Sequence, residues 1–482
     1  MWFSFLSLIL FTTSALAQFK RPISAQNATV SSLIYGLPLS IYAPTANSIA
    51  NQTGVWMTNT LFHATALEDP SSHSVVLFNV DTLYSRAVLD LSHGDLIATM
   101  PAMDPGRFVV WPFYDIFGND VCNFGTVTNS TAGKYRVTYR AGNPGCEAAR
   151  GDSEYAGTAY LPTAYGITFL RIEVGNASDV AHVVTEIQPG FTLASLPPHH
   201  APSAPPLTPE LLNSDPASGN TPLYIMQLLA RLAAFSPPEV LSDAPTIDAT
   251  LAAAGVHVAA QRYIPPAGVD LSRAFAAAQA AYAAIPTSPA WITLGGAWST
   301  LAPAVAGDFG TAYTARAYIA VNAYLLLSAD QAVYPFFAVT ETLSSNETYV
   351  LEFGGGKPRV TGFWSLTVYD AAGFLVPNPV DRYALGDRSN MTYPDGTRVY
   401  GGTSPANSTE PFYMLLQAAD NPPTAAEWAP NWLPTPAGGA AFRFVLRWFG
   451  PTAALLDGTY TYPTLTAVAA NPPLPRTGPS SE

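Results

Sequence analysis

Charge is scarce in this sequence, and lysine is scarcest of all. Charged residues make up 11% of the 482 residues, and only three of the 21 basic residues are lysines. A protein that binds nucleic acid needs a basic face to neutralise phosphates, and a net charge of −13 leaves little material for one. The same shortage of cations disfavours binding to an anionic membrane surface. The sequence therefore predicts no nucleic-acid partner.

Cysteine is almost absent. The two cysteines, Cys122 and Cys146, are close enough in sequence to form one disulfide in an oxidising compartment. That bond would close a loop of about 25 residues and contribute a few kcal/mol. Two unpaired thiols are the alternative. Long apolar runs are also lacking after the N-terminus, since the stretch 317–329 is too short to span a bilayer.

The N-terminus is predicted to be a signal peptide covering residues 1–17. It is short and apolar, ends in the small-residue pattern Ala15-x-Ala17, and lacks the usual early Lys or Arg. A membrane anchor is the alternative, but the run is under ~18 residues. Seven glycosylation sequons support secretion. No membrane span is expected after removal of the signal peptide. Their acceptors are Asn27, Asn51, Asn129, Asn176, Asn346, Asn390 and Asn407.

Glycine and proline are abundant, with 35 and 44 residues, which favours short strands and many turns. We expect a mainly β protein with an α-helical middle. The predicted segments are a β-rich N-terminal domain (18–195), a Pro-rich linker (196–220), an Ala-rich helical segment (221–333), a jelly-roll-like C-terminal β-sandwich (334–470) and a polar tail (471–482). Residues from about 30 to 190 are interpreted as mostly β.

Local patterns predict individual elements. Strands are expected at 74–78, 107–114, 134–140, 165–174, 348–353, 363–369 and 441–448, from β-branched or alternating residues. In the last of these, Phe442, Phe444, Leu446 and Trp448 share one face. Helices are expected from Thr221, as N-cap, to Pro237, and over 270–285 and 311–327.

Familiar catalytic motifs are missing. The sequence has no Gly-x-Ser-x-Gly, His-Glu-x-x-His, Cys-x-x-Cys, P-loop or dinucleotide fingerprint. None of the seven histidines has metal-ligand spacing, and His199 and His200 fall in the linker. The sequence identifies no metal site, no cofactor and no oligomeric state.

Two polar–aromatic clusters lie in the N-terminal half. In the first, Asn79 and Asp81 either satisfy a turn or, with Tyr84, point into a pocket as acid/base groups or ligand contacts. In the second, aromatic residues around Trp111 suit a core, and Tyr114 and Asp115 can form a pair that lines a cleft.

The third cluster lies in the C-terminal half. It runs through Trp364, Tyr369 and Asp370 to Arg382 and Arg388. Ion pairs Asp381–Arg388 or Asp387–Arg382 would tie a long loop to the sheet. Alternatively, the arginines beside aromatic rings suit an anionic or sugar-like ligand.

At these clusters the chain resembles a two-part family, the domain-of-unknown-function families 1254 (N-terminal) and 1214 (C-terminal). The resemblance spans about 30–190 and 300–465. The N-terminal motifs are Asn79-x-Asp81-Thr82-x-Tyr84, Leu89-Asp90-Leu91 and Arg107 to Asp115. The C-terminal motifs are Tyr313-x-x-Arg316-Ala317, Ala332-Val-Tyr334-Pro335, Phe363 to Asp370, Asn378-Pro379, Arg382-Tyr383, Asp387-Arg388-Ser389, Asn431 to Pro434 and Phe449-Gly450-Pro451.

The resemblance implies architecture: a β-rich domain, a helical connection and a jelly-roll-like sandwich. It implies no activity. Around Trp111, Cys122 and Cys146, and in the long Ala-rich middle, the chain departs from the family pattern.

The leading hypothesis is a secreted enzyme, or former enzyme, acting on a small polar organic molecule in a pocket between the two β domains. The catalytic candidates are Asp81, Tyr84, Asp115 and Asp370, and the ligand-binding candidates are Tyr114, Trp364, Tyr369 and Arg382. One alternative is a non-catalytic extracellular protein that binds a saccharide or secreted metabolite. Another is a structural cell-surface component.

Overall fold

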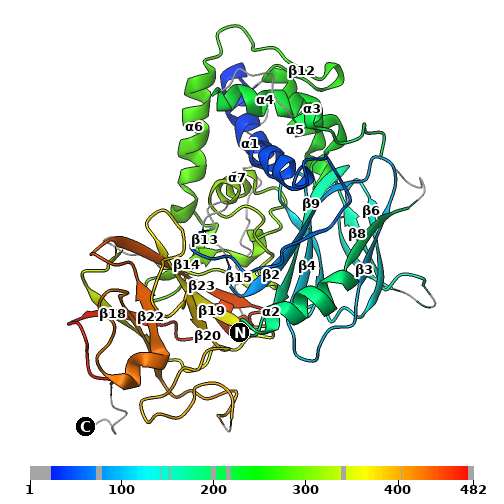
Figure 1. Ribbon diagram of the computed structural model, residues 1–482. Coiled ribbons are helices and arrows are strands. Elements are labelled where there is room, and N and C mark those ends of the chain that lie inside the picture. Colours follow the sequence, from blue (N-terminus) through cyan, green and yellow to red (C-terminus); the bar gives the residue numbers. More distant parts are fainter. Residues whose placement is uncertain are drawn as a thin grey trace, which may run out of the picture.

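The computed structural model describes residues 23–71, 77, 79–142, 144–149, 151, 153–196, 202–212, 219–337, 343–402 and 404–475. Within these ranges two β domains flank a group of helices (Figure 1). The predicted fold class, mainly β with helices, is confirmed. The predicted signal peptide, most of the strand at 74–78 and the pair His199–His200 lie outside the described residues.

The N-terminal domain is a sandwich of two five-stranded sheets. The first sheet has the order β1 (Phe62–His63), β2 (Thr82–Asp90), β9 (Tyr165–Glu173), β4 (Val109–Asp115) and β5 (Asp120–Gly125). The second has the order β10 (Thr192–Ser195), β3 (Leu96–Met100), β6 (Gly133–Tyr139), β8 (Gly157–Leu161) and β7 (Gly145–Ala148). Between them lies a core that includes Trp111, Phe113, Val137 and Leu170.

The predicted disulfide between Cys122 and Cys146 is confirmed. It joins β5, at the edge of the first sheet, to β7, at the edge of the second. The cross-link therefore closes one side of the sandwich.

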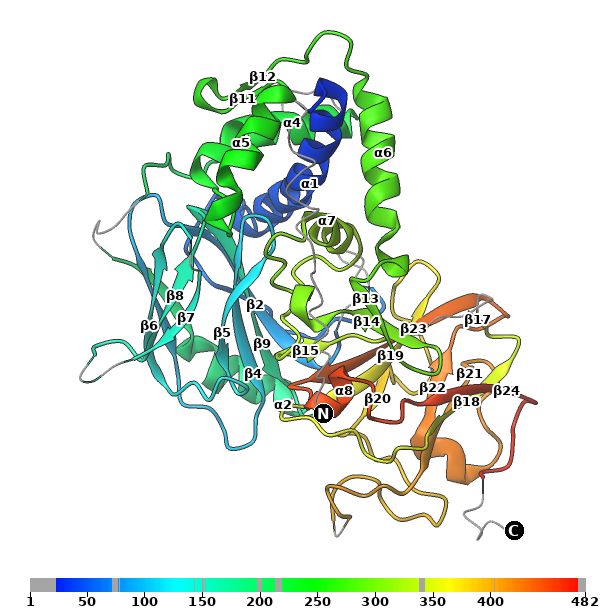
Figure 2. The same cartoon turned by 180° about the vertical axis from the view of Figure 1, so that it is seen from behind.

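The helical group is built around α1 (Ala25–Ala50), which contacts α4 (Thr221–Leu232), α5 (Ala244–Ala253), α6 (Leu271–Ala283) and α7 (Tyr313–Asn322) (Figure 2). The expectation of β structure from about residue 30 was wrong here. Helix α1 is buried on several sides, so it has no amphipathic stripe, and Pro38 and Pro44 lie inside it. A proline inside a helix costs ~3 kcal/mol, and burial against four helices offsets that cost.

Two other helix predictions need correction. The N-cap of α4 is Asn220, whose side chain accepts from Leu223 N at 3.2 Å, and Thr221 is the first helical residue. Helix α7 ends at Asn322, five residues before the predicted end. The middle segment also contains a hairpin of β13 (Trp291–Gly295) and β14 (Trp298–Leu301), which the alanine-rich composition did not predict.

Short elements complete the fold. They are α2 (Asp179–His182), α3 (Pro209–Leu212), β11 (Val256–His257) paired with β12 (Arg262–Tyr263), and β16 (Phe336–Phe337) paired with β14.

The C-terminal domain is a second sandwich. One sheet has the order β15 (Ala332–Val333), β23 (Ala441–Phe449), β19 (Trp364–Asp370) and β20 (Ala384–Gly386), with β17 (Leu343–Ser344) also paired to β23. The other has the order β22 (Trp432–Thr435), β21 (Phe412–Ala418), β18 (Thr348–Phe353) and β24 (Thr464–Val468), and the short helix α8 (Ala453–Leu456) precedes β24. As predicted, Phe442, Leu446 and Trp448 point into the core.

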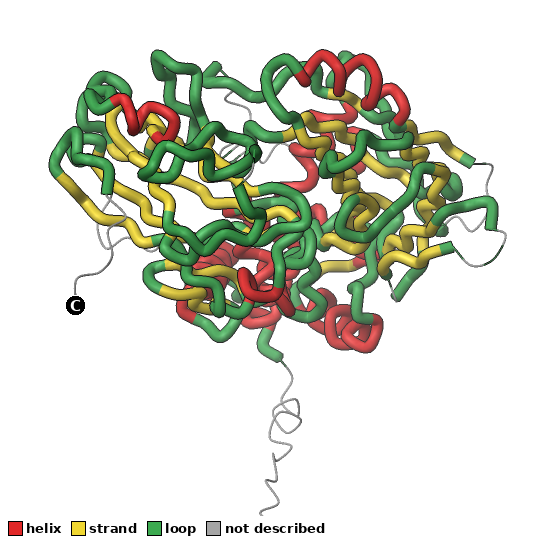
Figure 3. The backbone as a smooth tube through the Cα atoms, turned by 90° about the horizontal axis from the view of Figure 1, so that it is seen from below, coloured by secondary structure: helices red, strands yellow, loops and turns green. Residues whose placement is uncertain are grey.

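Seen at right angles to the first view, the strands gather in two groups, with helices along the lower edge and further helical turns at the upper edge (Figure 3). The helices contact one end of the outward face of the first sheet, where Val88, Val110 and Ile167 join their core. Strands β19 and β23 of the C-terminal domain reach the other end, where Ser365 contacts Asp81. No helix within the described residues is long and apolar enough to cross a membrane.

Candidate functional site

A buried polar layer separates the two β domains. In β19, Trp364, Leu366 and Val368 point into the C-terminal core, so the alternate residues Ser365, Thr367 and Tyr369 point outward. These outward residues are nevertheless at most 1% exposed, because the N-terminal domain covers them. We call this layer the interdomain seam. Its members are Asp81, Tyr84, Tyr114, Asp120, Arg171, Glu173, Tyr334, Ser365, Thr367, Tyr369, Asp387, Arg388 and Arg447.

At one end of the seam, Arg388 ties the domains together. Its Nη2 atom pairs with Asp81 Oδ1, and its Nη1 atom donates to the Val174 carbonyl at 2.8 Å. The other oxygen of Asp81 accepts a 2.5 Å hydrogen bond from Ser365 Oγ. The guanidinium lies 4.2 Å above the ring of Phe363. Both carboxylate oxygens of Asp81 are thus bound by residues of the C-terminal domain.

Two further carboxyl groups share Arg388. Its Nε atom lies 3.5 Å from Glu173 and 3.8 Å from Asp387. Burial raises the pKa of Asp387 to about 7, although Arg388 acts in the opposite direction. Burial likewise raises the pKa of Glu173, again against the effect of Arg388. One guanidinium therefore serves three carboxyl groups, and its role here is mainly to hold the domains together.

The middle of the seam contains a second buried arginine. Arg447, on β23, donates to Thr367 Oγ1 at 3.0 Å, to Tyr369 Oη at 2.7 Å and to the Leu77 carbonyl at 2.9 Å. The first two contacts are within the C-terminal domain and the third crosses to the N-terminal one. Tyr334, just after β15, interacts electrostatically with both Arg171 and Arg447.

The far end of the seam is centred on Arg171 of β9, which is 8% exposed. The Arg171 guanidinium lies 5.8 Å from the centroid of the Tyr84 ring and interacts electrostatically with Tyr114 and Tyr334. Its Nη1 atom has no hydrogen-bond partner among the described residues. Most buried polar atoms in proteins are paired, so this donor is a candidate for contact with a ligand.

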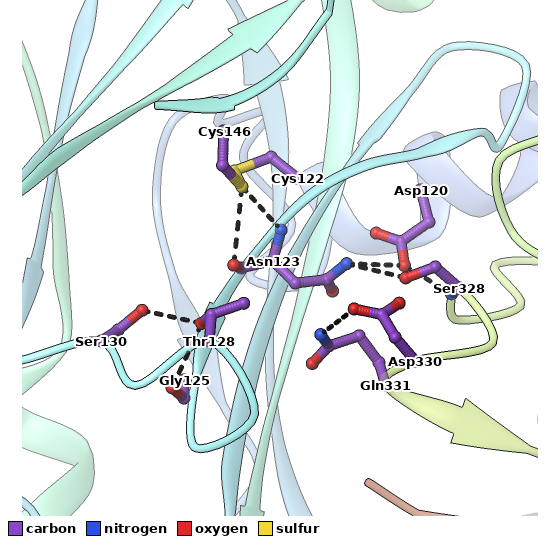
Figure 4. The surroundings of a disulfide bond; sticks show 10 residues. All are labelled: Asp120, Cys122, Asn123, Gly125, Thr128, Ser130, Cys146, Ser328, Asp330 and Gln331. Carbon is purple, nitrogen blue, oxygen red and sulfur yellow. Dashed lines mark hydrogen bonds between the residues drawn. A yellow bond between two sulfur atoms is a disulfide. The ribbon is translucent and has the colours of Figure 1, made fainter. Parts of the chain in front are cut away.

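Asp120, at the start of β5, lies within electrostatic range of Arg171. Its Oδ2 atom accepts from Ser328 N at 2.7 Å and from Asn123 Nδ2 at 2.9 Å (Figure 4). Its Oδ1 atom has no partner within the described part of the chain. Burial raises the pKa of Asp120 to about 7. A carboxyl group that titrates near neutrality can both donate and accept a proton.

Four of the eight predicted site residues lie in the seam: Asp81, Tyr84, Tyr114 and Tyr369. Asp115 does not. In the sheet, Asp115 pairs with Gly166 of β9. Thr82, which follows Asp81, pairs with Glu173, seven residues further along the same strand. At ~3.3 Å per residue that is ~23 Å, so Asp115 and Asp81 cannot contact one small ligand. The Asp115 carboxylate instead accepts from Phe117 N and Asn119 N in a turn.

The other three predicted residues have local roles. Trp364 is in the core and donates to Tyr400 Oη at 2.8 Å. Asp370 accepts from Phe374 N at 2.9 Å and lies five residues from Ser365, so it does not converge with Asp81. Arg382 donates to two carbonyls of its own domain, at 2.7 Å each. A single pocket that touches all eight predicted residues therefore does not exist in this fold. Neither considered ion pair forms, since Arg388 pairs with Asp81 instead.

The sequence analysis did not select Arg171, Asp120 or Arg447. A usable signal was present: in a chain with few charges, Arg171 lies between Leu170 and Ile172, and Arg447 lies between Leu446 and Trp448. Among the described residues, no group of three or more His, Cys, Asp or Glu side chains is arranged to hold a metal ion.

Comparisons with known proteins agree on the family and give no activity. Residues 58–195 match the family described as "Protein of unknown function (DUF1254)", and residues 338–453 match "Protein of unknown function (DUF1214)". No curated protein matches the chain.

Two solved structures match this chain, and the first shares its fold. The VPA0106 protein from Vibrio parahaemolyticus is 18% identical, with a TM-score of 0.61 over 92% of this chain and 100% of that one. A putative uncharacterized protein from Burkholderia cenocepacia is 11% identical, with a TM-score of 0.44 over 91% of this chain and 88% of that one. With both parts matched in order at the expected positions, the chain belongs to the two-part DUF1254/DUF1214 family.

Proposed function

We propose that the protein is a secreted glycoprotein enzyme that acts on a small organic acid held between its two β domains. Arg171, with Tyr84, Tyr114 and Tyr334 around it, binds the acid group. Asp120 transfers a proton to or from the bound molecule.

The observation that carries this proposal is the unpaired donor of Arg171. A buried guanidinium whose donors are bound by protein groups is a structural tie, as at Arg447. Arg171 is equally enclosed, yet its Nη1 atom has no partner in the described ranges. A planar guanidinium binds carboxylates through paired hydrogen bonds, so a carboxylate is the natural partner.

Asp120 supports catalysis over binding alone. Its raised pKa, about 7, comes mainly from burial, and its Oδ1 atom has no partner among the described residues. A binding protein does not need a buried carboxyl group of this kind, whereas perturbed carboxyl groups are typical of acid/base enzymes.

Secretion is supported by two surface features. All seven sequon asparagines are exposed, so each is accessible to a glycosyltransferase. The Cys122–Cys146 disulfide is of a kind that persists in oxidising compartments.

Thermal unfolding with small acids tests the binding step. The probes are sugar acids and phenolic acids, each paired with its neutral counterpart, such as glucuronate with glucose. A ligand at 100 times its Kd stabilises the fold by about 2.7 kcal/mol, which raises Tm visibly. We expect acids to raise Tm, neutral counterparts to leave it unchanged, and Arg171→Gln to abolish the effect.

The matched control is Arg140→Gln, because Arg140 also lies over a tyrosine ring, 3.3 Å from the centroid of Tyr160, but outside the seam. Tyr84→Phe, which keeps the ring and removes the hydroxyl, is a milder second variant. Absence of any shift with every acid contradicts the proposal and favours a structural cell-surface component.

Turnover is measured on the acids that bind, by following their ¹H NMR signals during incubation. We expect the wild type to consume one of them, and Asp120→Asn to bind it with turnover reduced by ~10²–10⁴-fold. Binding without turnover by the wild type would replace this proposal with the alternative, a non-catalytic binding protein for a secreted metabolite.

A further inference from the structure

A second polar site lies outside the seam, where the helical segment meets both β domains. Two cavities, of about 550 and 520 Å³, share one lining residue, Glu239. Glu239 is 9% exposed, and its Oε2 atom has no hydrogen-bond partner among the described residues. A buried carboxyl oxygen without a partner, on the wall of a cavity, is a candidate ligand contact.

The smaller cavity is acidic. Its polar lining consists of Glu239, Asp308, Ser328 and Asp330, and none of its lining residues is Lys, Arg or His. Glu239 and Asp308 hydrogen-bond to each other. The rest of the wall is aliphatic or proline: Pro303, Ala304, Ala306, Gly310, Ala329 and Leu456. The wall of this cavity therefore combines carboxyl groups with small apolar side chains.

We propose that this cavity binds a short aliphatic amine, with its ammonium group between Glu239 and Asp308. An ammonium offers three donors, which suits the unpaired Oε2 atom and the oxygens of Asp308. The aliphatic wall accommodates the methylene chain, and a volume of about 520 Å³ is in the range of small-molecule sites. Asp330, which also lines the cavity and is exposed, is the candidate partner for a second ammonium group.

The protonation state of Glu239 makes the site sensitive to pH. Burial, followed by the charges of Asp308 and Asp115, raises the pKa of Glu239 to about 9, and Arg316 acts in the opposite direction. Arg140 lines the neighbouring cavity together with Glu239. At pH 7 Glu239 holds a proton, so a bound ammonium must displace it. The affinity for the amine should therefore rise up to tenfold per pH unit between pH 7 and 9.

Isothermal titration calorimetry of the full glycosylated chain with 1,4-diaminobutane tests the proposal, with 1,4-butanediol as the uncharged probe of the same skeleton. We expect the diamine to bind more tightly at pH 8 than at pH 7, with release of a proton, and the diol not to bind. Glu239→Gln should weaken diamine binding at least tenfold. Glu410→Gln, the same change at an exposed position, should leave it unchanged.

Asp308→Asn is the second variant if Glu239→Gln does not fold, and it should show the same loss. Equal binding of diamine and diol, or full affinity in both variants, overturns the proposal. Arg171→Gln should not affect diamine binding, so failure of the seam proposal and failure of this one are distinguishable.

Discussion

Removing the Asp81 carboxylate should weaken the attachment between the two β domains. Asp81→Asn preserves the shape of the side chain and removes the charge that faces Arg388. Breaking a buried ion pair by removing one partner typically costs ~3–5 kcal/mol. Here Arg388 retains Glu173 at 3.5 Å and the Val174 carbonyl at 2.8 Å. We therefore expect a loss of about 2–3 kcal/mol, a factor of roughly 30 to 150 in the folding equilibrium.

The control is an exposed pair of similar composition. Arg107 binds Asp104 at 2.9 Å and Asp179 at 2.7 Å, and the Asp104 side chain is 42% exposed. Because exposed pairs contribute ~0–1 kcal/mol, Asp104→Asn should change stability by less than 1 kcal/mol. The two variants differ mainly in burial, so the comparison isolates the effect of enclosing the charge.

Urea unfolding followed by tryptophan fluorescence gives the free energies, and a double-mutant cycle with Arg388→Met isolates the pair. We expect a coupling energy of ~1–3 kcal/mol between Asp81 and Arg388, which are 307 residues apart in sequence. A coupling near zero, or an Asp81→Asn loss no larger than that of Asp104→Asn, would refute the view that this pair holds the domains together.

Three other perturbations give measurable effects. The folded-state pKa of Asp120 is about 7, above its unfolded value, so the free energy of unfolding should fall by roughly 4 kcal/mol as pH rises from ~4 to ~7. The Asp120→Asn variant should lack this dependence on pH. An unchanged pH dependence in the variant would count against the assignment. Gly36→Val should lower stability by ~1–3 kcal/mol, since a Cβ there lies 2.5 Å from Leu229 Cδ1, and a neutral result would mean that α1 and α4 separate easily. Replacing Cys122 and Cys146 by serine should cost about 3 kcal/mol in urea unfolding, and no loss would contradict the loop-entropy estimate.

Strands were easier to predict from the sequence than helix α1. The strand β18 was predicted at its observed bounds, and β19 and β23 within one residue, because alternation places one row of side chains in a core. Helix α1 gave no such signal. It is surrounded by other helices, so apolar residues appear on all its sides, and Pro38 and Pro44 suggested a break. Local preference was overridden by tertiary packing, which the sequence alone does not display.

The candidate site was predicted in part, for a related reason. Asp81 and Tyr84 stood out because polar residues clustered beside a strand. Ser365 and Arg447 lie on the alternate face of their strands, which in an isolated sandwich would face water. Their burial depends on a second domain, and the Asp81–Ser365 contact joins residues 284 positions apart. Without knowing that the domains meet on this face, the sequence could not distinguish a solvent-exposed serine from a buried one.

Within the seam, the pairing of polar atoms distinguishes residues that join the domains from residues that are candidates for ligand binding. At Arg388 and Arg447 the guanidinium groups hydrogen-bond to carboxylates, hydroxyls and carbonyls from both domains, so they serve the attachment. At Arg171 and Asp120 a donor and an acceptor remain unpaired in the described part of the chain, although burial of such atoms is costly. Unpaired atoms also occur at the other end, where Arg388 Nε and Asp387 Oδ1 have no hydrogen-bond partner among the described residues, but there Arg388 is already paired with the Asp81 carboxylate. Arg171 is instead surrounded by tyrosines, which is why the search for a substrate should begin there.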